Sequence, residues 1–281
     1  MKMILKGLGK GFTYLWYGGF RYRRNLIADN LTLAYGDKLS GSDKDELVFR
    51  NLLHYVYLGL EFCQLLWLSK KRLLSSVEFK NKHFLDEALQ SGKGVVVLSS
   101  HLGNFEWAAA VGAQVMGRPI HIVARSIRNG FIHRWLSQVR KHWGIVEILP
   151  QNAKWGLFKI LKRGGLVGFM IDQRKSPPDG VWVPFFGKLA CTTQGVAYLV
   201  ERTDALVLPT YCYRTDFSKF VVQFEKPLEY KRVGTRRQNS YHNTEVYSRT
   251  VESFIRRHPE QWFWIHRRWK GYQNAHVQHL S

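Results

Sequence analysis

His101 and Glu106 are the two residues of this 281-residue chain whose types and spacing are best suited to chemistry. They lie in the segment GVVVLSSHLGNFEW (94–107), where an apolar run ends in a small polar loop and a helix should begin. A neutral imidazole at the end of a buried strand, held by a nearby carboxylate, is the minimum equipment of a general base. Glu106 could hold the Nδ1–H of His101, so that Nε2 is free to take a proton from a hydroxyl group. The alternative is an ordinary polar loop without a catalytic role.

Other residues fit the same strand-to-helix junction. Asn104 is of a type that caps helix N-termini, and Gly103 allows the backbone torsions of a tight turn. In open α/β sheets such junctions face the crevice beyond the carboxyl ends of the strands, where ligands bind. Asp172 and Gln173 end another apolar run and are expected to line this crevice. Asp172 could instead cap a helix or pair with Arg174.

The elements that position these residues alternate between short β-rich runs and helical segments from residue 92 onward. This alternation predicts an α/β fold with a mixed, largely parallel sheet flanked by helices. A polar, basic loop is expected over residues 231–243. The expected strands are 95–99, 120–124, 146–149, 166–171, 205–213 and 220–224, and the expected helices are 105–117, 130–142, 153–163, 194–202 and 246–257.

The chain before this region is predicted to be helical, so we divide it into a membrane-associating region, 1–75, and a catalytic domain, 76–281. A second, strongly apolar helix is expected over 47–68, with a capped start near Ser42 and the basic residues 70–72 at its end. The first helix has an apolar face and a lysine face, typical of a helix that lies in a membrane surface. A helix packed on the domain core is the alternative. The two faces are Leu5, Leu8, Phe12 and Leu15, and Lys2, Lys6 and Lys10.

The charge balance points to an anionic partner. The chain has 42 Lys and Arg against 21 Asp and Glu, a formal net charge of +21. Such a surplus suits nucleic acid, an anionic membrane surface, or acidic substrates and carrier proteins. Ten Trp, thirteen Tyr and seventeen Phe favour a membrane interface, although aromatic rings also stack on bases. No apolar run is long enough to predict a spanning helix.

Several other chemistries lack their motifs. The chain has no G-x-S-x-G nucleophile elbow and no H-E-x-x-H. Its three cysteines, Cys63, Cys191 and Cys212, are too far apart for a C-x-x-C site. We therefore expect no metal site.

Four segments in order make the chain resemble the bacterial lipid A biosynthesis acyltransferases, the lauroyl/myristoyl transferases of the glycerolipid acyltransferase superfamily. These are HLGNFE, HIVARSIRN, FMIDQRKSPPDGVWVPFFGKLACTTQG and HPEQWFWIHRRWK; RYRRNLIADNLTLAYG resembles the family's N-terminal segment. The resemblance implies an O-acyltransferase that moves a fatty acyl group from a thioester donor to a hydroxyl of a membrane glycolipid. In this reading His101 deprotonates the acceptor hydroxyl, and Glu106 orients and balances the imidazolium.

The resemblance also assigns binding roles. Asn104, Asp172 and Gln173 would line the substrate site, and Arg125 would clamp an acceptor anion, although a surface ion pair is its alternative. Arg267 and Arg268 would hold headgroup phosphates, or else belong to a docked C-terminal segment.

The donor would be an acidic acyl carrier protein or acyl-CoA, and the acceptor a phosphorylated glycolipid, a lipid A precursor or a relative. No cofactor is implied beyond the thioester co-substrate. The place of action would be the cytoplasmic face of the bacterial inner membrane, with peripheral or shallow attachment. Two alternatives are a nucleic-acid-binding protein that uses the basic, aromatic surface and a non-catalytic lipid-binding relative; specific nucleic-acid binding is not expected.

Overall fold

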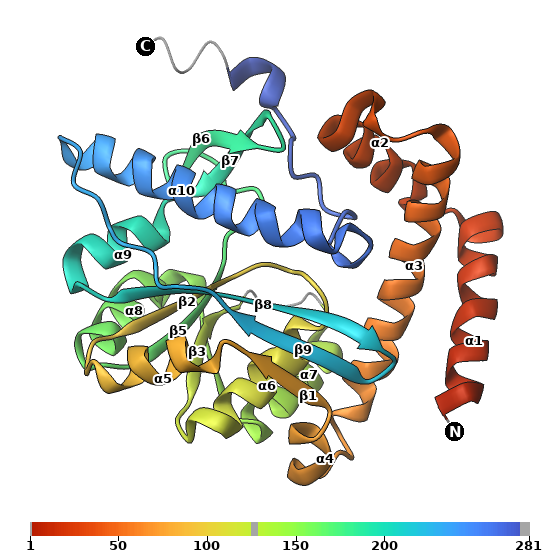
Figure 1. Ribbon diagram of the computed structural model, residues 1–281, viewed down its shortest axis with the longest axis horizontal. Coiled ribbons are helices and arrows are strands. Elements are labelled where there is room, and N and C mark those ends of the chain that lie inside the picture. The colour runs from red at the N-terminus through yellow and green to blue at the C-terminus, as the bar shows by residue number, and fades with distance from the viewer. Residues whose placement is uncertain (1, 125–128, 276–281) are drawn as a thin grey trace.

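The computed structural model describes residues 2–124 and 129–275, and its centre is a seven-stranded sheet in the order β1-β9-β8-β2-β5-β3-β4 (Figure 1). Neighbouring strands are parallel except β8 and β9, which form an antiparallel pair. The predicted α/β fold with a largely parallel sheet is confirmed. The strands are β1 (Val77–Lys80), β2 (Val95–Ser99), β3 (Ile120–Val123), β4 (Ile145–Ile148), β5 (Leu166–Met170), β8 (Leu206–Asp216) and β9 (Lys219–Phe224), with β6 (Gly180–Phe185) and β7 (Lys188–Thr193) as a separate hairpin.

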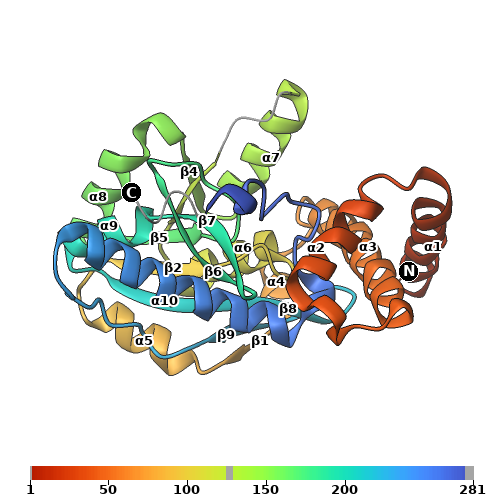
Figure 2. The same ribbon diagram turned by 90° about the horizontal axis from the view of Figure 1, so that it is seen from above.

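Helices cover both faces of the sheet. Successive side chains of a strand point to opposite faces, so Val96 and Leu98 of β2 join a core with α8 to α10, while Val95 packs with α5 and α6. Figure 2 shows α10 along one face of the sheet. The helices are α1 (Lys2–Leu15), α2 (Arg24–Tyr35), α3 (Gly41–Gln64), α4 (Lys70–Leu74), α5 (Lys82–Gln90), α6 (Phe105–Met116), α7 (Gly130–His142), α8 (Ala153–Lys162), α9 (Gly195–Thr203) and α10 (Arg236–Arg257).

Two predicted boundaries are wrong. The segment 231–243 is not wholly a loop, because Thr235 and Gln238 form a capping box that starts α10 at Arg236. The apolar helix does not run to residue 68 either: α3 ends at Gln64, and Ser69 caps the separate helix α4, which contains the basic residues 70–72. In both places a local side-chain cap decides where the helix begins.

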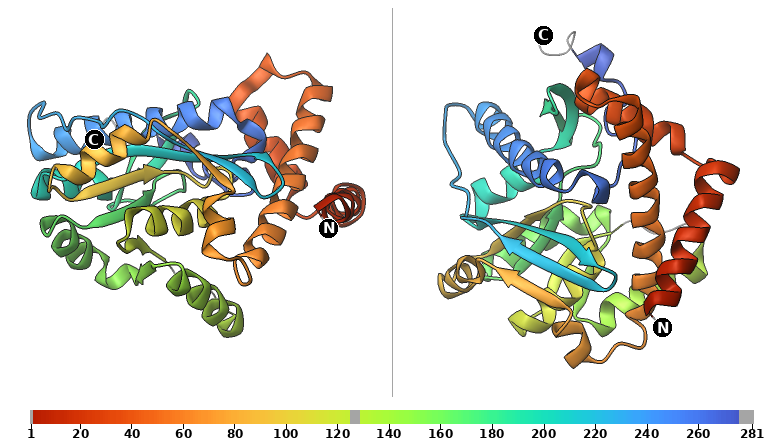
Figure 3. Two further views of the ribbon diagram at one scale, coloured as in Figure 1. Left: turned by 60° about the horizontal axis from the view of Figure 1, so that its bottom comes forward. Right: turned by 45° about the vertical axis from the view of Figure 1, so that its right-hand side comes forward.

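The N-terminal helices form an arm at one end of the molecule, with α1 lying alongside α3 (Figure 3). A Cβ on Gly9 would lie 2.7 Å from the ring of Tyr57, so this glycine lets α1 approach α3 closely. Thr13, on the same side of α1, is fully buried. The opposite side of α1 carries exposed apolar side chains, and α2 and α3 contribute Ile27, Leu31 and other residues to the main core. Among the described residues, no helix is long and apolar enough to cross a membrane.

The segment after α10 crosses back over the ends of the central strands. It begins with the short helix η4 (Pro259–Gln261), and Leu102 and Trp262 form an isolated antiparallel bridge. Asn51 of α3 donates from its amide to the carbonyl oxygen of Trp262 at 2.7 Å. This segment therefore joins the N-terminal arm to the loop that contains His101.

Candidate active site

Strand register brings His101 beside Asp172. Ser99, the last residue of β2, is paired with Met170, the last residue of β5, in parallel register. Two residues beyond each strand end the chain reaches His101 and Asp172, which must therefore lie side by side. The His101 backbone N–H donates to Asp172 Oδ2 at 2.8 Å, and Nδ1 of its ring lies 2.9 Å from Oδ1.

The tautomer of His101 follows from this contact. An ionised carboxylate can only accept, so Nδ1 carries the proton and Nε2 presents a lone pair. Burial of Asp172, whose side chain is 1 % exposed, would by itself raise its pKa. The positive charge that the imidazole of His101 carries once protonated, the hydrogen bonds from His101 and the bond from Trp262 Nε1 outweigh burial and lower the pKa of Asp172 to about 2. Asp172 thus stays ionised and orients the imidazole for proton transfer.

Nε2 of His101 is already used as an acceptor. The side-chain amide nitrogen of Gln173 lies 3.3 Å from it. The His101 side chain is 20 % exposed, so a small donor group from outside can reach the ring. The predicted crevice therefore contains His101, Asp172 and Gln173, and the Gln173 amide marks the place that a substrate hydroxyl would take.

Glu106 does not orient His101 as predicted. Both of its carboxylate oxygens accept from Arg140 of α7, which also pairs with Glu147 of β4. Successive residues of an α-helix are rotated by about 100°, so Phe105 faces the His101 ring, with centroids 5.0 Å apart, while Glu106 faces α7. The orienting carboxylate is Asp172. Arg140 gave no signal in the sequence, because no motif marks its distance from Glu106.

Asn104 caps a helix from a buried position, so its side chain cannot make the predicted contact with substrate. It is fully buried; its side-chain oxygen accepts from the Trp107 N–H at 3.0 Å, which caps α6 as expected. Its amide donates to Glu61 of α3 at 3.0 Å. Next to it, Gly103 has a φ of 58°, and a Cβ there would meet the Cys212 carbonyl oxygen at 2.2 Å. The loop between β2 and α6 is thus held from several sides.

The arginines predicted to bind substrate differ in their exposure to solvent. Arg268 is fully buried and donates to the carbonyl oxygens of Gln173 and Cys191 and to the hydroxyl of Thr192, so it cannot reach a headgroup phosphate. For Arg268 the alternative prediction, a docked C-terminal segment, is the one that the structure shows. Arg267 is exposed, and its role in headgroup binding stays a prediction. Arg125 lies outside the described residues.

His266 follows Trp262 in the segment that crosses the strand ends. Its carbonyl oxygen accepts from the Asn30 amide at 2.8 Å and from the Arg268 N–H at 2.9 Å. Burial lowers the pKa of His266 to about 4; the charge of Asp172 opposes this effect, while Arg268, His101 and Arg23 add to it. The motif HPEQWFWIHRRWK also contains Trp262, but nothing in its spacing indicated the hydrogen bond from Trp262 to Asp172.

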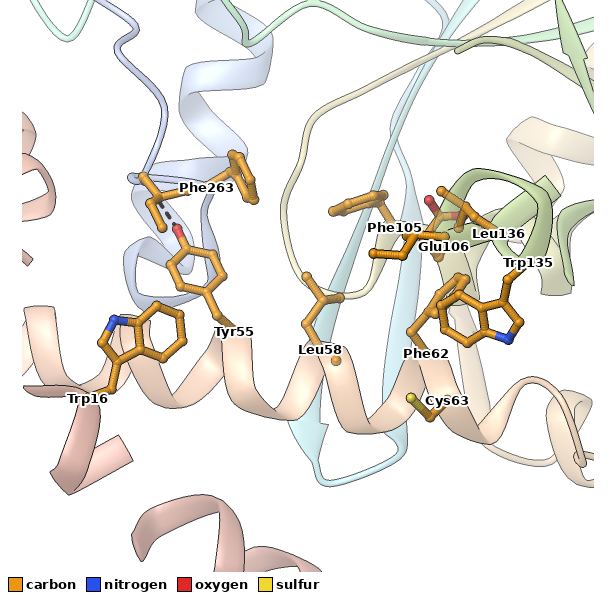
Figure 4. A pocket seen from close by; sticks show the side chains of 13 residues that line it. Trp16, Tyr55, Leu58, Phe62, Cys63, Phe105, Glu106, Trp135, Leu136 and Phe263 are labelled. Atoms are coloured by element: carbon orange, nitrogen blue, oxygen red, sulfur yellow. Dashed lines mark hydrogen bonds between the residues drawn. The ribbon is translucent and has the colours of Figure 1, made fainter. Parts of the chain in front are cut away.

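An apolar groove of about 580 Å³ opens beside the site (Figure 4). Tyr55 and Phe263 lie at one end of it and Trp135 and Leu136 at the other, with Phe105 and Glu106 between them, while α3 forms its floor. Phe263 also lies against His101, with ring centroids 5.8 Å apart. The further lining residues are Trp16, Leu58, Gly59, Phe62, Cys63, Ile132, Trp135, Leu136 and Ile265. A groove of this composition suits a hydrocarbon chain that ends near the imidazole. In the described ranges, no three His, Cys, Asp or Glu side chains come together as a metal site.

Comparison with known proteins places this geometry in context. A family model described as bacterial lipid A biosynthesis acyltransferase matches residues 2–271. The chain is 24% identical to the lipid A biosynthesis palmitoleoyltransferase of Escherichia coli, over 89% of this chain and 80% of that protein. It is also 24% identical to the E. coli lipid A biosynthesis lauroyltransferase, over 95% and 85%. A phosphatidylinositol mannoside acyltransferase of Mycolicibacterium smegmatis is 26% identical over 60% of this chain and 56% of its own.

Proposed function

Because the chain belongs to the bacterial lipid A biosynthesis acyltransferase family and is an acyltransferase, we propose that it transfers a fatty acyl group from a thioester to a hydroxyl of a lipid A precursor or a related glycolipid. The observation that supports this reaction best is the His101–Asp172 pair, with Nε2 turned to an accessible position beside an apolar groove. The mycobacterial relative acts on a different glycolipid by its name, so the acceptor is proposed at the level of class.

The proposed reaction needs only the residues present and its two substrates. The acceptor hydroxyl replaces the Gln173 amide at Nε2 of His101 and gives its proton to that nitrogen as its oxygen attacks the thioester carbonyl carbon. The new C–O bond forms, the C–S bond breaks, and the imidazolium returns its proton to the departing thiolate. Asp172 carries the opposite charge through the step, so the imidazolium is stabilised where it forms.

The apolar groove is proposed to bind the acyl chain of the donor. An acyl chain lying in it places its carbonyl end near Phe105 and Phe263, because both rings lie against His101. Glu106 also lines the groove, and its pair with Arg140 ties α6 to α7. The donor is proposed to be an acyl carrier protein or CoA thioester; both are anionic and suit a chain of net charge +21.

The place of action is proposed to be the cytoplasmic face of the inner membrane, with peripheral attachment. Support comes from α1, whose apolar side chains Ile4 and Leu8 are 66% and 65% exposed, and from its lysines. Arg267 and Arg125 remain proposed contacts for acceptor phosphates.

The test is acyl transfer by purified His101→Ala protein, with His83→Ala as a matched control on the exposed face of α5. Labelled acyl carrier protein or acyl-CoA is the donor, and the lipid product is identified by mass spectrometry. We expect His101→Ala to lower the rate by about 10²- to 10⁴-fold and His83→Ala to leave it unchanged. Near-wild-type transfer by a folded His101→Ala protein would refute the proposal.

A further inference from the structure

The walls of the apolar groove continue outward into exposed apolar side chains. Trp16 of the short helix η1 (Trp16–Phe20) and Ile132 of α7 both line the groove, and they come from elements on different sides of α3 (Figure 2). Ile132 is also 44% exposed, so it belongs to the rim as well as the wall. The opening of the groove therefore lies between η1 and α7.

Both sides of this opening carry large apolar side chains that the fold does not cover. On one side, Met3, Ile4, Leu8, Phe12 and Leu15 of α1 and Phe20 of η1 are at least half exposed. On the other side, Phe131 in the first turn of α7 is 73% exposed. Phe131 does not line the groove and contributes little to the core. Only a partner outside this chain's fold could therefore bury its ring.

We propose that α1 and the first turn of α7 are two anchors that dock the mouth of the groove on a bilayer containing anionic lipids. The inference deepens the proposed function, because it brings the mouth of the groove that holds the donor chain to the membrane surface in which the glycolipid acceptor lies. With α1 as the sole anchor, the body of the protein could rotate about that helix. A second anchor on α7 holds the mouth of the groove against the surface, so that the acceptor hydroxyl meets the thioester there.

Charge identifies the bilayer as the partner. Residues 2–28 contain three Lys and three Arg and no acidic residue. In α7, Arg134 and Lys141 are exposed and the helix has no acidic residue, while Arg140 is neutralised by Glu106 and Glu147. Basic side chains beside exposed apolar ones match a surface that is anionic outside and apolar beneath. An acidic carrier protein would match the charge but offers no apolar layer for side chains as exposed as Phe131 and Leu8.

The position of Phe131 allows a clean substitution. Asn129 caps α7 and accepts from the N–H groups of Phe131 and Ile132, at 3.0 Å and 3.1 Å. An acidic residue in the first turn of a helix is favoured by the helix dipole, so Phe131→Glu removes the apolar contact without weakening the helix. Val233→Glu is the matched control: this side chain is 51% exposed and precedes α10, whose start lies at the other end of the molecule from α1 (Figure 1).

The experiment measures binding of the full chain to phosphatidylcholine vesicles with about a third phosphatidylglycerol. Phe131→Glu should weaken binding by roughly tenfold or more, since a side chain of this size contributes at least that factor when buried. Val233→Glu and Phe131→Trp should bind like the wild type, and circular dichroism should show both Glu variants folded. Wild-type binding by Phe131→Glu would overturn the proposal.

Two further outcomes would also overturn it. If Phe131→Glu lost affinity for an acyl carrier protein while keeping affinity for vesicles, the patch would be a carrier-protein surface. If it changed the mass of the lipid-free protein from dimer to monomer, the patch would be an interface between two copies. Vesicle binding needs no acyl donor, so a membrane-bound wild type that transfers no acyl group would refute the proposed function and leave the docking inference standing.

Discussion

A buried ion pair beneath the catalytic loop gives the sharpest stability prediction. Arg214 of β8 donates to both carboxylate oxygens of Glu61 on α3, each at 2.6 Å. Their side chains are 8% and 0% exposed. Glu61 also accepts from Asn104 and from the Ser218 backbone N–H. The carboxylate therefore balances a buried guanidinium and satisfies the residue that caps α6.

Glu61→Gln keeps the shape of the side chain and removes its charge. The guanidinium of Arg214 then stays buried, and a remaining partner is the ring of His54, at 2.6 Å. That ring is neutral, because burial and the charge of Arg214 hold the pKa of His54 well below its usual value. Breaking one side of a buried pair costs about 3–5 kcal/mol of unfolding free energy. For a chain of this size that loss corresponds to a fall in melting temperature of roughly 6 to 20 °C.

The matched control is Asp204→Asn. Asp204 and Lys93 also lie 2.6 Å apart, but their side chains are 84% and 47% exposed. An exposed pair contributes about 0–1 kcal/mol, so the control should change stability by no more than that. Urea unfolding followed by circular dichroism measures both variants. If Glu61→Gln loses no more stability than Asp204→Asn, burial does not set the strength of this pair and the reasoning fails.

Two further predictions concern the site. Asp172→Asn removes the acceptor that fixes the His101 tautomer and should lower acyl transfer by about 10²- to 10⁴-fold in a steady-state assay, with the protein still folded at neutral pH; unchanged transfer would remove Asp172 from the mechanism. In the folded protein His266 has a pKa of about 4, below its ordinary value of 6.5. As the pH falls, the unfolded chain therefore binds a proton before the folded chain does. The stability that His266 contributes is present above pH 6.5 and is lost as the pH falls towards 4. Urea unfolding of His266→Gln should therefore show a smaller loss of stability over this window than the wild type, and parallel pH profiles would contradict the assignment.

The sequence predicted most of the elements but not which of them are neighbours. Apolar periodicity, the Asn104 cap and the alternation of strands and helices predicted the α/β class and the strands β2, β3, β4, β5, β8 and β9, because these signals are local; β1, α5 and the β6–β7 hairpin were not predicted. The order of strands in a sheet is not local. Only the pairing of β2 with β5 shows that Asp172, seventy-one positions after His101, contacts the imidazole nitrogen. Glu106, five positions after His101, pairs with Arg140 instead.

Burial was the other missing quantity. The sequence HRRWK left headgroup binding and a docked segment both open, and it could not show that Arg268 lies inside the fold among carbonyl oxygens, where the segment after α10 turns inward around Trp262, Trp264 and Trp269. The groove escaped prediction for a similar reason. Leu58 and Phe62 have the apolar character of core residues, and only the packing of α3 against α7 leaves space above them.

The bridge between Leu102 and Trp262 has a consequence for synthesis of the protein. Trp262 supplies a hydrogen bond to Asp172, and it leaves the ribosome after every strand of the sheet. Chains fold from the N-terminus during translation, so α1 and the strands leave the ribosome before residues 259–269 can pack over the sheet. The hydrogen bond from Trp262 to Asp172 is therefore one of the last contacts of the site to form during synthesis.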